Sequence, residues 1–192
     1  MDEEFKKVLD RLIDEVVELH YRWDMYKEVF FGGKEQTDLL NKSGSNFFYY
    51  TQHLMLDKIA LMFSKLTDPN KQGKFENLSL KQVHVYASDR GELEFVAELK
   101  GKFGALIEAC EKFRSLRNKR IAHGDLEHSL GIAEKPLPGI SIKYVEHALQ
   151  ILRKYMDLVE LHYSNSQTGY ACIKGPYGAG GHALINALSK NA

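Results

Sequence analysis

Helical periodicity constrains this chain more than any other feature of its sequence. Apolar residues recur at intervals of three and four along most of its length, and the first stripe includes Leu12, Leu19 and Trp23. This spacing places side chains on one face of an α-helix. No pair of segments carries the alternating pattern and short turn of a strand hairpin. The sequence therefore predicts an all-α protein that folds as an antiparallel helical bundle.

Turn signals divide the chain into four to five main helices. Gly32-Gly33 ends the first helix, and Asp68-Pro69 ends the second because proline disfavours helix in the residue before it. The second helix has a weak point at Ser43-Gly44-Ser45. A polar loop is expected over residues 70–77.

Two helix-capping signals follow the polar loop. Ser79 and Gln82 have the spacing of a capping box for a short helix, and Ser141 is placed to cap the last long helix. Between them, one long helix is expected from about residue 91 to residue 119. We predict a helical domain over residues 1–163, followed by a Gly- and Tyr-rich tail over 164–192 that ends in a short amphipathic helix.

The composition of the chain limits which molecules it is expected to bind. The chain has 26 basic and 26 acidic residues among 192, so no overall field draws it to DNA or to a membrane surface. Its two cysteines, Cys110 and Cys172, lack the spacing of a zinc site, and Cys110 falls on an apolar stripe. The first residues resemble no signal peptide, and no apolar run is long enough to cross a bilayer. We expect a cytoplasmic protein without metal or cofactor.

The segment from Ser115 to Asp125 concentrates the chemistry of the chain. Arg117 and Asn118 lie at the predicted end of the long helix, and His123 follows six residues after the arginine. Arginine offers a fixed donor fork for phosphate oxygens, and histidine can give or take a proton near neutral pH. Three further cations, Arg114, Lys119 and Arg120, lie beside them and could bind RNA phosphates.

This set of side chains suits metal-independent cleavage of RNA. The ribose 2′-OH must lose a proton as it attacks phosphorus, the leaving 5′-oxygen must gain one, and charge on the phosphoryl oxygens must be stabilised. Arg117 can stabilise the charge, and His123 can perform one of the two proton transfers. A two-fold homodimer would supply the second histidine, because an isologous interface duplicates every residue about its axis.

The motif and its surroundings resemble a known family. Arg117-Asn118 followed by His123 is similar to the R-x(4–6)-H signature of the HEPN superfamily, whose members are all-helical and include many metal-independent endoribonucleases of toxin–antitoxin and antiphage systems. The resemblance to its abortive-infection, AbiU-type branch extends to Tyr21-Arg-Trp23, Phe47-Phe48, Leu66-Thr-Asp-Pro69 and Asn77-Leu-Ser-Leu80.

The resemblance implies a role for each residue of the motif. Arg117 would bind the scissile phosphate, His123 would be the acid or base, and Asn118 would orient one of them. It also implies RNA as substrate, a homodimer with both motifs in one cleft, and a cognate antitoxin or inhibitor. Single-stranded RNA is the expected target, because the 2′-OH must reach an in-line position. Some HEPN toxins carry a modified tyrosine two residues after the histidine. Here that position is Asp125, so the sequence departs from this pattern and regulation through a modified tyrosine is not expected. Asp125 is assigned only a supporting role in the site.

Simpler readings stand beside these. The helix dipole by itself favours Arg114, Lys119 and Arg120 near a helix C-terminus. Arg117 lies next to the buried stripe and needs a partner, either a phosphate or a carboxylate such as Asp125 or Glu127. The alternative function is then a non-catalytic RNA- or nucleotide-binding module, or a regulatory helical module.

Histidines elsewhere in the chain have no metal-site spacing. His84 and five others fall on predicted helices without an i, i+4 pair among them, and we expect them to be surface residues or hydrogen-bonded core residues.

Overall fold

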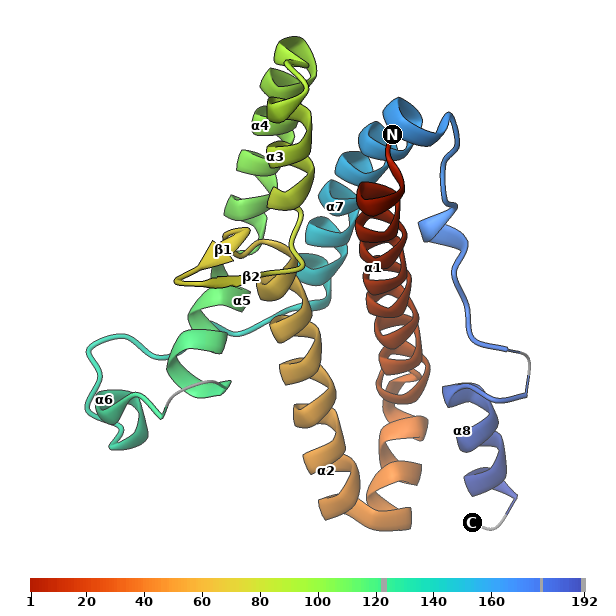
Figure 1. Cartoon of the computed structure of the whole chain (residues 1–192). Helices are drawn as coiled ribbons and strands as arrows, with labels where there is room; N and C mark the ends of the chain where they lie inside the picture. Colours follow the sequence, from red (N-terminus) through yellow and green to blue (C-terminus); the bar gives the residue numbers. More distant parts are fainter. Residues whose placement is uncertain (122–123, 177, 191–192) are drawn as a thin grey trace. The chain divides into compact units, whose positions relative to one another are not determined.

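The computed structural model describes residues 1–121, 124–176 and 178–190 (Figure 1). Its regular structure is almost entirely helical, which confirms the predicted all-α helical bundle. The only strands among the described residues are two of two residues each, β1 (Lys71–Gln72) and β2 (Phe75–Glu76). Within the same described ranges, no helix has both the length and the apolar character needed to cross a membrane.

The chain forms two compact units. Unit 1 consists of Met1–Val16 and Ala60–Gly169, and unit 2 consists of Val17–Ile59 and Tyr170–Ala192. The two longest helices, α1 (Glu3–Phe30) and α2 (Gly33–Leu66), each contribute to both units. The predicted division of the chain at residue 163 stays a prediction.

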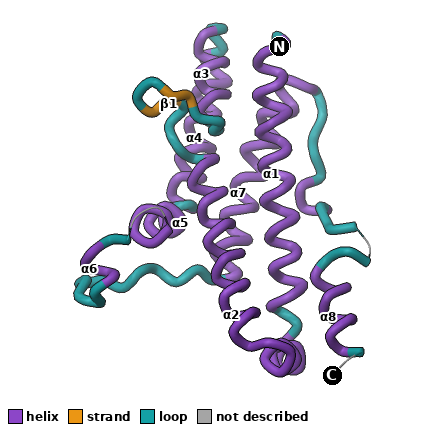
Figure 2. The backbone as a smooth tube through the Cα atoms, turned by 60° about the horizontal axis from the view of Figure 1, so that its bottom comes forward, coloured by secondary structure: helices purple, strands orange, loops and turns teal. Residues whose placement is uncertain are grey.

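The helices of unit 1 pack through their apolar faces. α3 (Lys81–Asp89) packs against α4 (Leu93–Ala109), and α4 packs against α7 (Ile142–Ser164), so the apolar positions of these helices form one core. Ser141 caps α7 through a hydrogen bond from the Tyr144 backbone N–H, as its sequence predicts. Figure 2 shows α6 as a short helix within the long connection to α7. The remaining elements of unit 1 are α5 (Glu111–Leu116), the π-helix η1 (Arg117–Ile121) and α6 (Leu126–Ser129).

Unit 2 joins the second half of α1 to the first part of α2 and to the C-terminal segment. Its other elements are the 3₁₀-helix η2 (Tyr170–Cys172) and α8 (Gly181–Ser189). Trp23 and Tyr26 are buried, as core residues should be. Gly44 has non-helical dihedral angles and kinks α2 at the predicted weak point. Gln36 binds the carbonyl oxygens of Glu28 and Val29, so its side chain satisfies the open end of α1.

Three local predictions were wrong. Ser79 does not cap α3, because its buried hydroxyl has no partner among the described residues and Leu80 holds the cap position. The side chain of Gln82 binds the carbonyl oxygens of Asn70 and Asn77 instead.

The other two corrections concern a loop and a helix. The expected polar loop contains the small β1–β2 hairpin. The expected single helix over 91–119 is interrupted at Cys110, a buried residue that fits the apolar stripe and carries no breaker signal.

Candidate functional site

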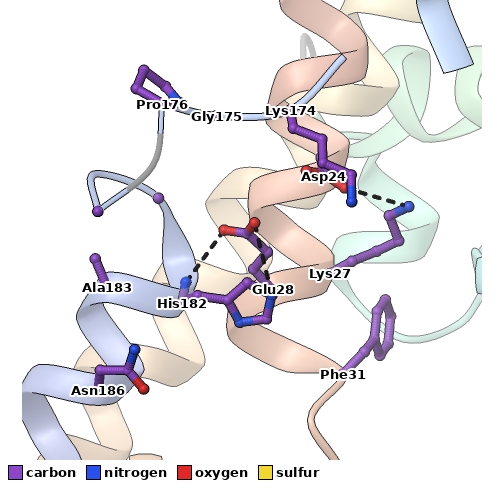
Figure 3. Close-up of a pocket in the computed structure, with 12 residues that line it drawn as sticks. Asp24, Lys27, Glu28, Phe31, Lys174, Gly175, Pro176, His182, Ala183 and Asn186 are labelled. Atoms are coloured by element: carbon purple, nitrogen blue, oxygen red, sulfur yellow. Dashed lines mark hydrogen bonds and ion pairs between the residues drawn. The ribbon is translucent and has the colours of Figure 1, made fainter. Parts of the chain in front are cut away.

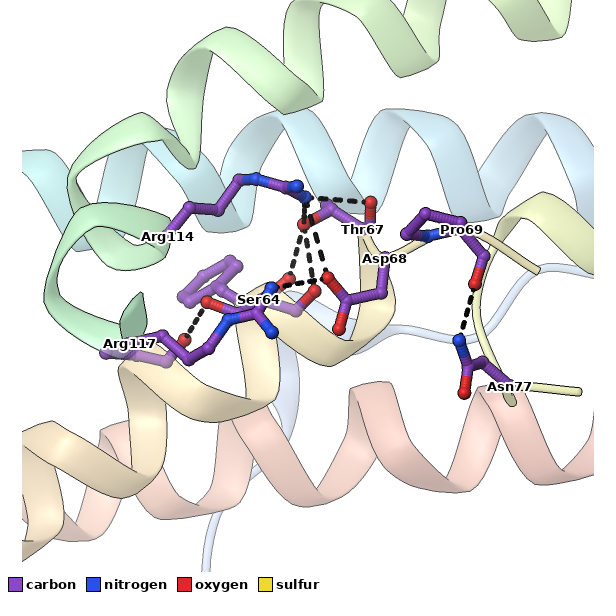
Figure 4. A network of polar contacts seen from close by, with 9 residues as sticks. Ser64, Thr67, Asp68, Pro69, Asn77, Arg114 and Arg117 are labelled. Atoms are coloured by element: carbon purple, nitrogen blue, oxygen red, sulfur yellow. Dashed lines mark hydrogen bonds and ion pairs between the residues drawn. The ribbon is translucent and has the colours of Figure 1, made fainter. Parts of the chain in front are cut away.

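The end of α2 forms one side of the candidate site in unit 1. Pro69 stops the helix, and the hydroxyl of Thr67 donates to the Phe63 carbonyl oxygen at 2.9 Å. Thr67 is buried, so this bond holds the last turn in place. Asn77 donates to the Pro69 carbonyl oxygen at 2.9 Å and ties the following chain to the same turn (Figure 4). Asp68 is thereby held in a well-defined position.

Two arginines reach this turn from the segment formed by α5 and η1. Arg114 Nη1 donates to the carbonyl oxygen of Thr67 at 3.0 Å and to its hydroxyl at 3.2 Å, and lies 3.9 Å from Asp68 Oδ1. Arg117 Nη2 donates to Asp68 Oδ1 at 2.6 Å. Figure 4 shows both guanidinium groups converging on Thr67 and Asp68. Arg114 therefore has a structural contact that helix-dipole reasoning did not anticipate.

The contact between Arg117 and Asp68 is a charge-assisted hydrogen bond in a partly buried place. The two side chains are 25% and 20% exposed. A second donor of the same guanidinium, Nε, is buried and has no partner within the described ranges. An unsatisfied buried donor is uncommon in a folded protein and calls for a partner. Arg117 is thus fixed by one carboxylate and retains donor capacity.

The carboxylate that pairs with Arg117 is neither of those expected from the sequence. Asp125 instead begins α6, where its Oδ1 accepts from the His128 backbone N–H at 3.1 Å and contacts Nδ1 of the same residue at 2.7 Å. These bonds, that of the His128 ring first, lower the pKa of Asp125. The sequence marks Asp68 only as a helix-ending residue, since no spacing rule relates positions 49 residues apart.

The other motif residues lie on η1 or just after it. η1 runs from Arg117 to Ile121 as a π-helix, a geometry found frequently at functional sites. Asn118, Lys119 and Arg120 are all exposed along it. His123 lies outside the described residues, so the structure gives no position for the predicted acid or base. Among the residues described, no group of three or more metal-binding side chains is present.

A cleft of about 310 Å³ opens beside Asp68 within unit 1. Glu15, Glu76 and Asp68 contribute carboxylates to its wall, while Lys65 contributes the cation. A phosphate would meet net negative charge on this side of Asp68.

Unit 2 holds a larger cleft of about 670 Å³ between α1 and the Gly-rich segment before α8 (Figure 3). Lys27, Lys174 and Phe31 line it. The carboxylate of Glu28 accepts a hydrogen bond from the His182 backbone N–H at 3.2 Å. Glu28 thus already occupies the positive end of α8, where a phosphate would otherwise bind. The described residues of the Gly-rich segment therefore offer no P-loop-like phosphate site at the start of α8.

Comparison with known proteins places the chain in a family. The model of the HEPN_AbiU2 family, described as AbiU2, matches residues 2–184. No curated protein and no solved structure matches the chain. Because the match spans nearly its whole length, this chain belongs to the abortive-infection AbiU2 family of HEPN proteins, as its resemblance indicated.

Proposed function

We propose that this AbiU2-family protein is a metal-independent endoribonuclease that cuts single-stranded RNA as a homodimer and acts as an abortive-infection effector. The observation that carries the proposal is the placement of Arg117. Asp68 holds the guanidinium through a hydrogen bond of 2.6 Å, and the buried Nε of the same group has no partner within the described ranges. Arg117 is also the first residue of the π-helix η1, six residues before His123.

The proposed reaction assigns one task to each side chain. The ribose 2′-oxygen attacks the adjacent phosphorus and loses its proton to one His123. The bond to the 5′-oxygen breaks, and that oxygen takes a proton from His123 of the second copy. Arg117 stabilises the charge on the phosphoryl oxygens, and Asn118 orients the phosphate or the imidazole. The products are a 2′,3′-cyclic phosphate and a 5′-hydroxyl end.

The neighbouring residues would support binding. Lys119 and Arg120 are exposed beside Arg117 on η1, where they can attract the phosphates of an unpaired strand. Arg114 of α5 would contribute its charge as well, although its guanidinium also binds the end of α2 at Thr67. Asp125 would support the site indirectly, since its carboxylate binds the ring of His128. A cognate antitoxin or inhibitor is the partner that would keep such an enzyme inactive.

One observation favours the alternative function. The ion pair between Arg117 and Asp68 is short and partly buried, which is what a purely structural arginine would show. In a regulatory helical module, Arg117 would remain closed on Asp68. In a non-catalytic RNA-binding module, Arg117 and His123 would instead bind phosphate without cleaving the strand. Tight, steeply salt-dependent RNA binding without any cleavage product would select that function.

The deciding experiment is RNA cleavage by the purified full chain in the presence of a chelator. We expect degradation of unpaired RNA, with His123→Ala lowering the rate by a factor of about 100 or more, since a positioned acid or base contributes that much. His147→Ala is the matched control, because His147 is exposed on α7. Equal rates for wild type and His123→Ala, with the helical circular dichroism unchanged, would reject the nuclease assignment.

A further inference from the structure

The β1–β2 hairpin of unit 1 has a defined shape although it buries none of its side chains. Residues 71–76 are all exposed. Lys71 pairs with Glu76 and Gln72 pairs with Phe75. The two-residue turn between the strands begins with Gly73 at a φ of 60°, a conformation that favours glycine. Because so short a hairpin is marginally stable by itself, it needs support from the rest of the unit.

That support comes from amide groups at the base of the hairpin. Asn77 donates its backbone N–H to the Asn70 carbonyl oxygen at 2.7 Å and its side-chain amide to the Pro69 carbonyl oxygen at 2.9 Å. Gln82 of α3 donates to the carbonyl oxygens of both Asn70 and Asn77. A loop that is held by the scaffold and yet adds nothing to the core is typical of a binding element.

The exposed side chains of the hairpin combine an aromatic ring with a cation. Phe75 is 67% exposed, and Nζ of Lys74 lies 5.4 Å from the centre of its ring. Side chains alternate between the two faces of a strand pair. Phe75 therefore shares a face with Gln72, its partner in the pairing, and Glu76 lies on the opposite face. The ring is thus flanked by a cation and an amide, while the carboxylate of the hairpin lies on the other side.

These groups suit single-stranded nucleic acid better than protein. Single strands are bound by aromatic rings on which bases stack and by cations that follow the phosphates. The centres of protein interfaces are instead depleted in lysine, and residues 71–76 include two lysines and one glutamate. A base stacked on the exposed ring of Phe75 would bring its phosphate close to Lys74.

The hairpin follows directly on the turn that holds Arg117. Asp68, which pairs with Arg117, is four residues before Gln72. Four residues span at most about 14 Å and paired strands lie about 5 Å apart, so Phe75 is within roughly 20 Å of Asp68. Figures 1 and 2 show the hairpin projecting from unit 1 on the same side as α5. An unpaired strand of about 4 or more nucleotides would cover that separation.

We propose that Phe75 stacks a base of the RNA substrate and that Lys74 binds a neighbouring phosphate. The β1–β2 hairpin then positions the strand whose scissile phosphate lies at Arg117. Both residues bind substrate, and neither takes part in a proton transfer. The choice of RNA as ligand rests on the proposed function.

The test is binding of the full chain to a fluorescent, 2′-O-methylated RNA of about 12 nucleotides, measured by fluorescence anisotropy. Methylation removes the attacking 2′-OH, so the proposed cleavage cannot consume the probe. We expect Phe75→Ala to raise the dissociation constant about 10-fold or more, because one base loses its stack. Phe75→Tyr keeps the ring and should bind within about 2-fold of wild type. Lys74→Ala should lower the slope of log affinity against log salt by about 0.7, the value for one phosphate contact with a single strand.

Phe47→Ala is the matched control, because Phe47 of α2 is 66% exposed. It should bind the RNA as wild type does, with the helical circular dichroism of every variant unchanged. A wild-type chain that does not bind the probe, or an equal loss in Phe75→Ala and Phe47→Ala, would overturn the inference. Wild-type affinity in Phe75→Ala would also overturn it and leave the hairpin as a contact for protein.

The inference and the proposed nuclease fail separately. A chain that binds the probe as expected but never cuts unmodified RNA would reject the nuclease and leave the binding surface of the hairpin standing. A chain that cuts RNA while Phe75→Ala and Lys74→Ala keep wild-type affinity would do the reverse.

Discussion

At the scale of single residues, the position of Arg117 is the central fact. Its Nη2 is 2.6 Å from a carboxylate of a turn that is itself held by Thr67 and Asn77. A guanidinium fixed in this way loses little further freedom when it binds a phosphate. The same contact also competes with that phosphate, because Asp68 already takes one of its donors. Asp68 therefore decides how available Arg117 is.

Replacing Asp68 by asparagine separates these two effects. Asp68→Asn keeps the shape and removes the charge. We expect the free energy of unfolding to fall by about 1–2 kcal/mol, since the Arg117 guanidinium then donates to a neutral amide oxygen in place of a charged carboxylate. We also expect affinity for a single-stranded RNA oligonucleotide at low salt to rise about 5-fold, because no carboxylate competes for the guanidinium. Urea unfolding and fluorescence anisotropy measure the two quantities.

The control for that substitution is Glu76→Gln, which removes the same charge from the same cleft. It should change RNA affinity less than Asp68→Asn does. If Asp68→Asn is less stable but binds RNA with wild-type affinity, then Arg117 has only a structural role. That result would favour the regulatory helical module over the nuclease.

At the scale of elements, α8 depends on close approach to α1 within unit 2. Val29 belongs to a buried cluster with Leu40 and Phe48, and Ile185 and Leu188 of α8 pack against it. A Cβ at Gly181 would lie 2.7 Å from Cβ of Glu28 and 2.7 Å from Cγ2 of Val29. Neither neighbour is the free end of a flexible side chain, so the start of α8 tolerates only glycine at this position.

Gly181→Ala should therefore weaken the docking of α8. We expect a loss of about 1–3 kcal/mol from overpacking, and faster hydrogen exchange over residues 181–189. Gly101→Ala in α4 is the matched control, since a Cβ there meets nothing within 4 Å. That variant should gain about 0.5–1 kcal/mol, because alanine is the better helix former. Unchanged exchange of α8 in Gly181→Ala would contradict the packing described.

At the scale of the whole molecule, His84 links folding to pH. The expectation that it would be a surface or hydrogen-bonded residue was wrong. It is 6% exposed, and neither ring nitrogen has a partner in the part of the chain that the structure describes. Burial, together with the charges of Lys81 and Lys100, lowers the pKa of His84 from 6.5 to about 4. The ring lies against Phe103 and Tyr155, where its neutral form is favoured.

The sign of the pH effect follows from that lowered pKa. Between pH 6.5 and about 4 the unfolded chain binds a proton at His84 and the folded chain does not, so stability is complete above this range and falls as the pH drops through it. We expect a loss of about 3 kcal/mol from this group across the range. Urea unfolding at several pH values should give a shallower pH dependence for His84→Phe than for wild type. Identical pH dependences would show that His84 is not responsible.

The sequence by itself determined the fold class, the family and most helix ends of this protein. Apolar spacing, Gly32-Gly33, Pro69 and the cap at Ser141 act through bonds and contacts close along the chain, and such local effects can be read from the order of residues. The motif at Arg117 and Asn118 was visible for the same reason. Its position at the end of a helix was also predictable, although the break at Cys110 and the π-helix were not.

Only the tertiary structure decided which groups meet. Asp68 pairs with Arg117, which is 49 residues away along the chain. The His84 ring is surrounded by aromatic rings, Phe103 of α4 and Tyr155 of α7. Phe47 and Leu54 of α2 look in the sequence like members of one more apolar stripe, and their exposure appears only once the helix is packed. Contacts between distant segments depend on how all the stripes close together, and no local pattern encodes that.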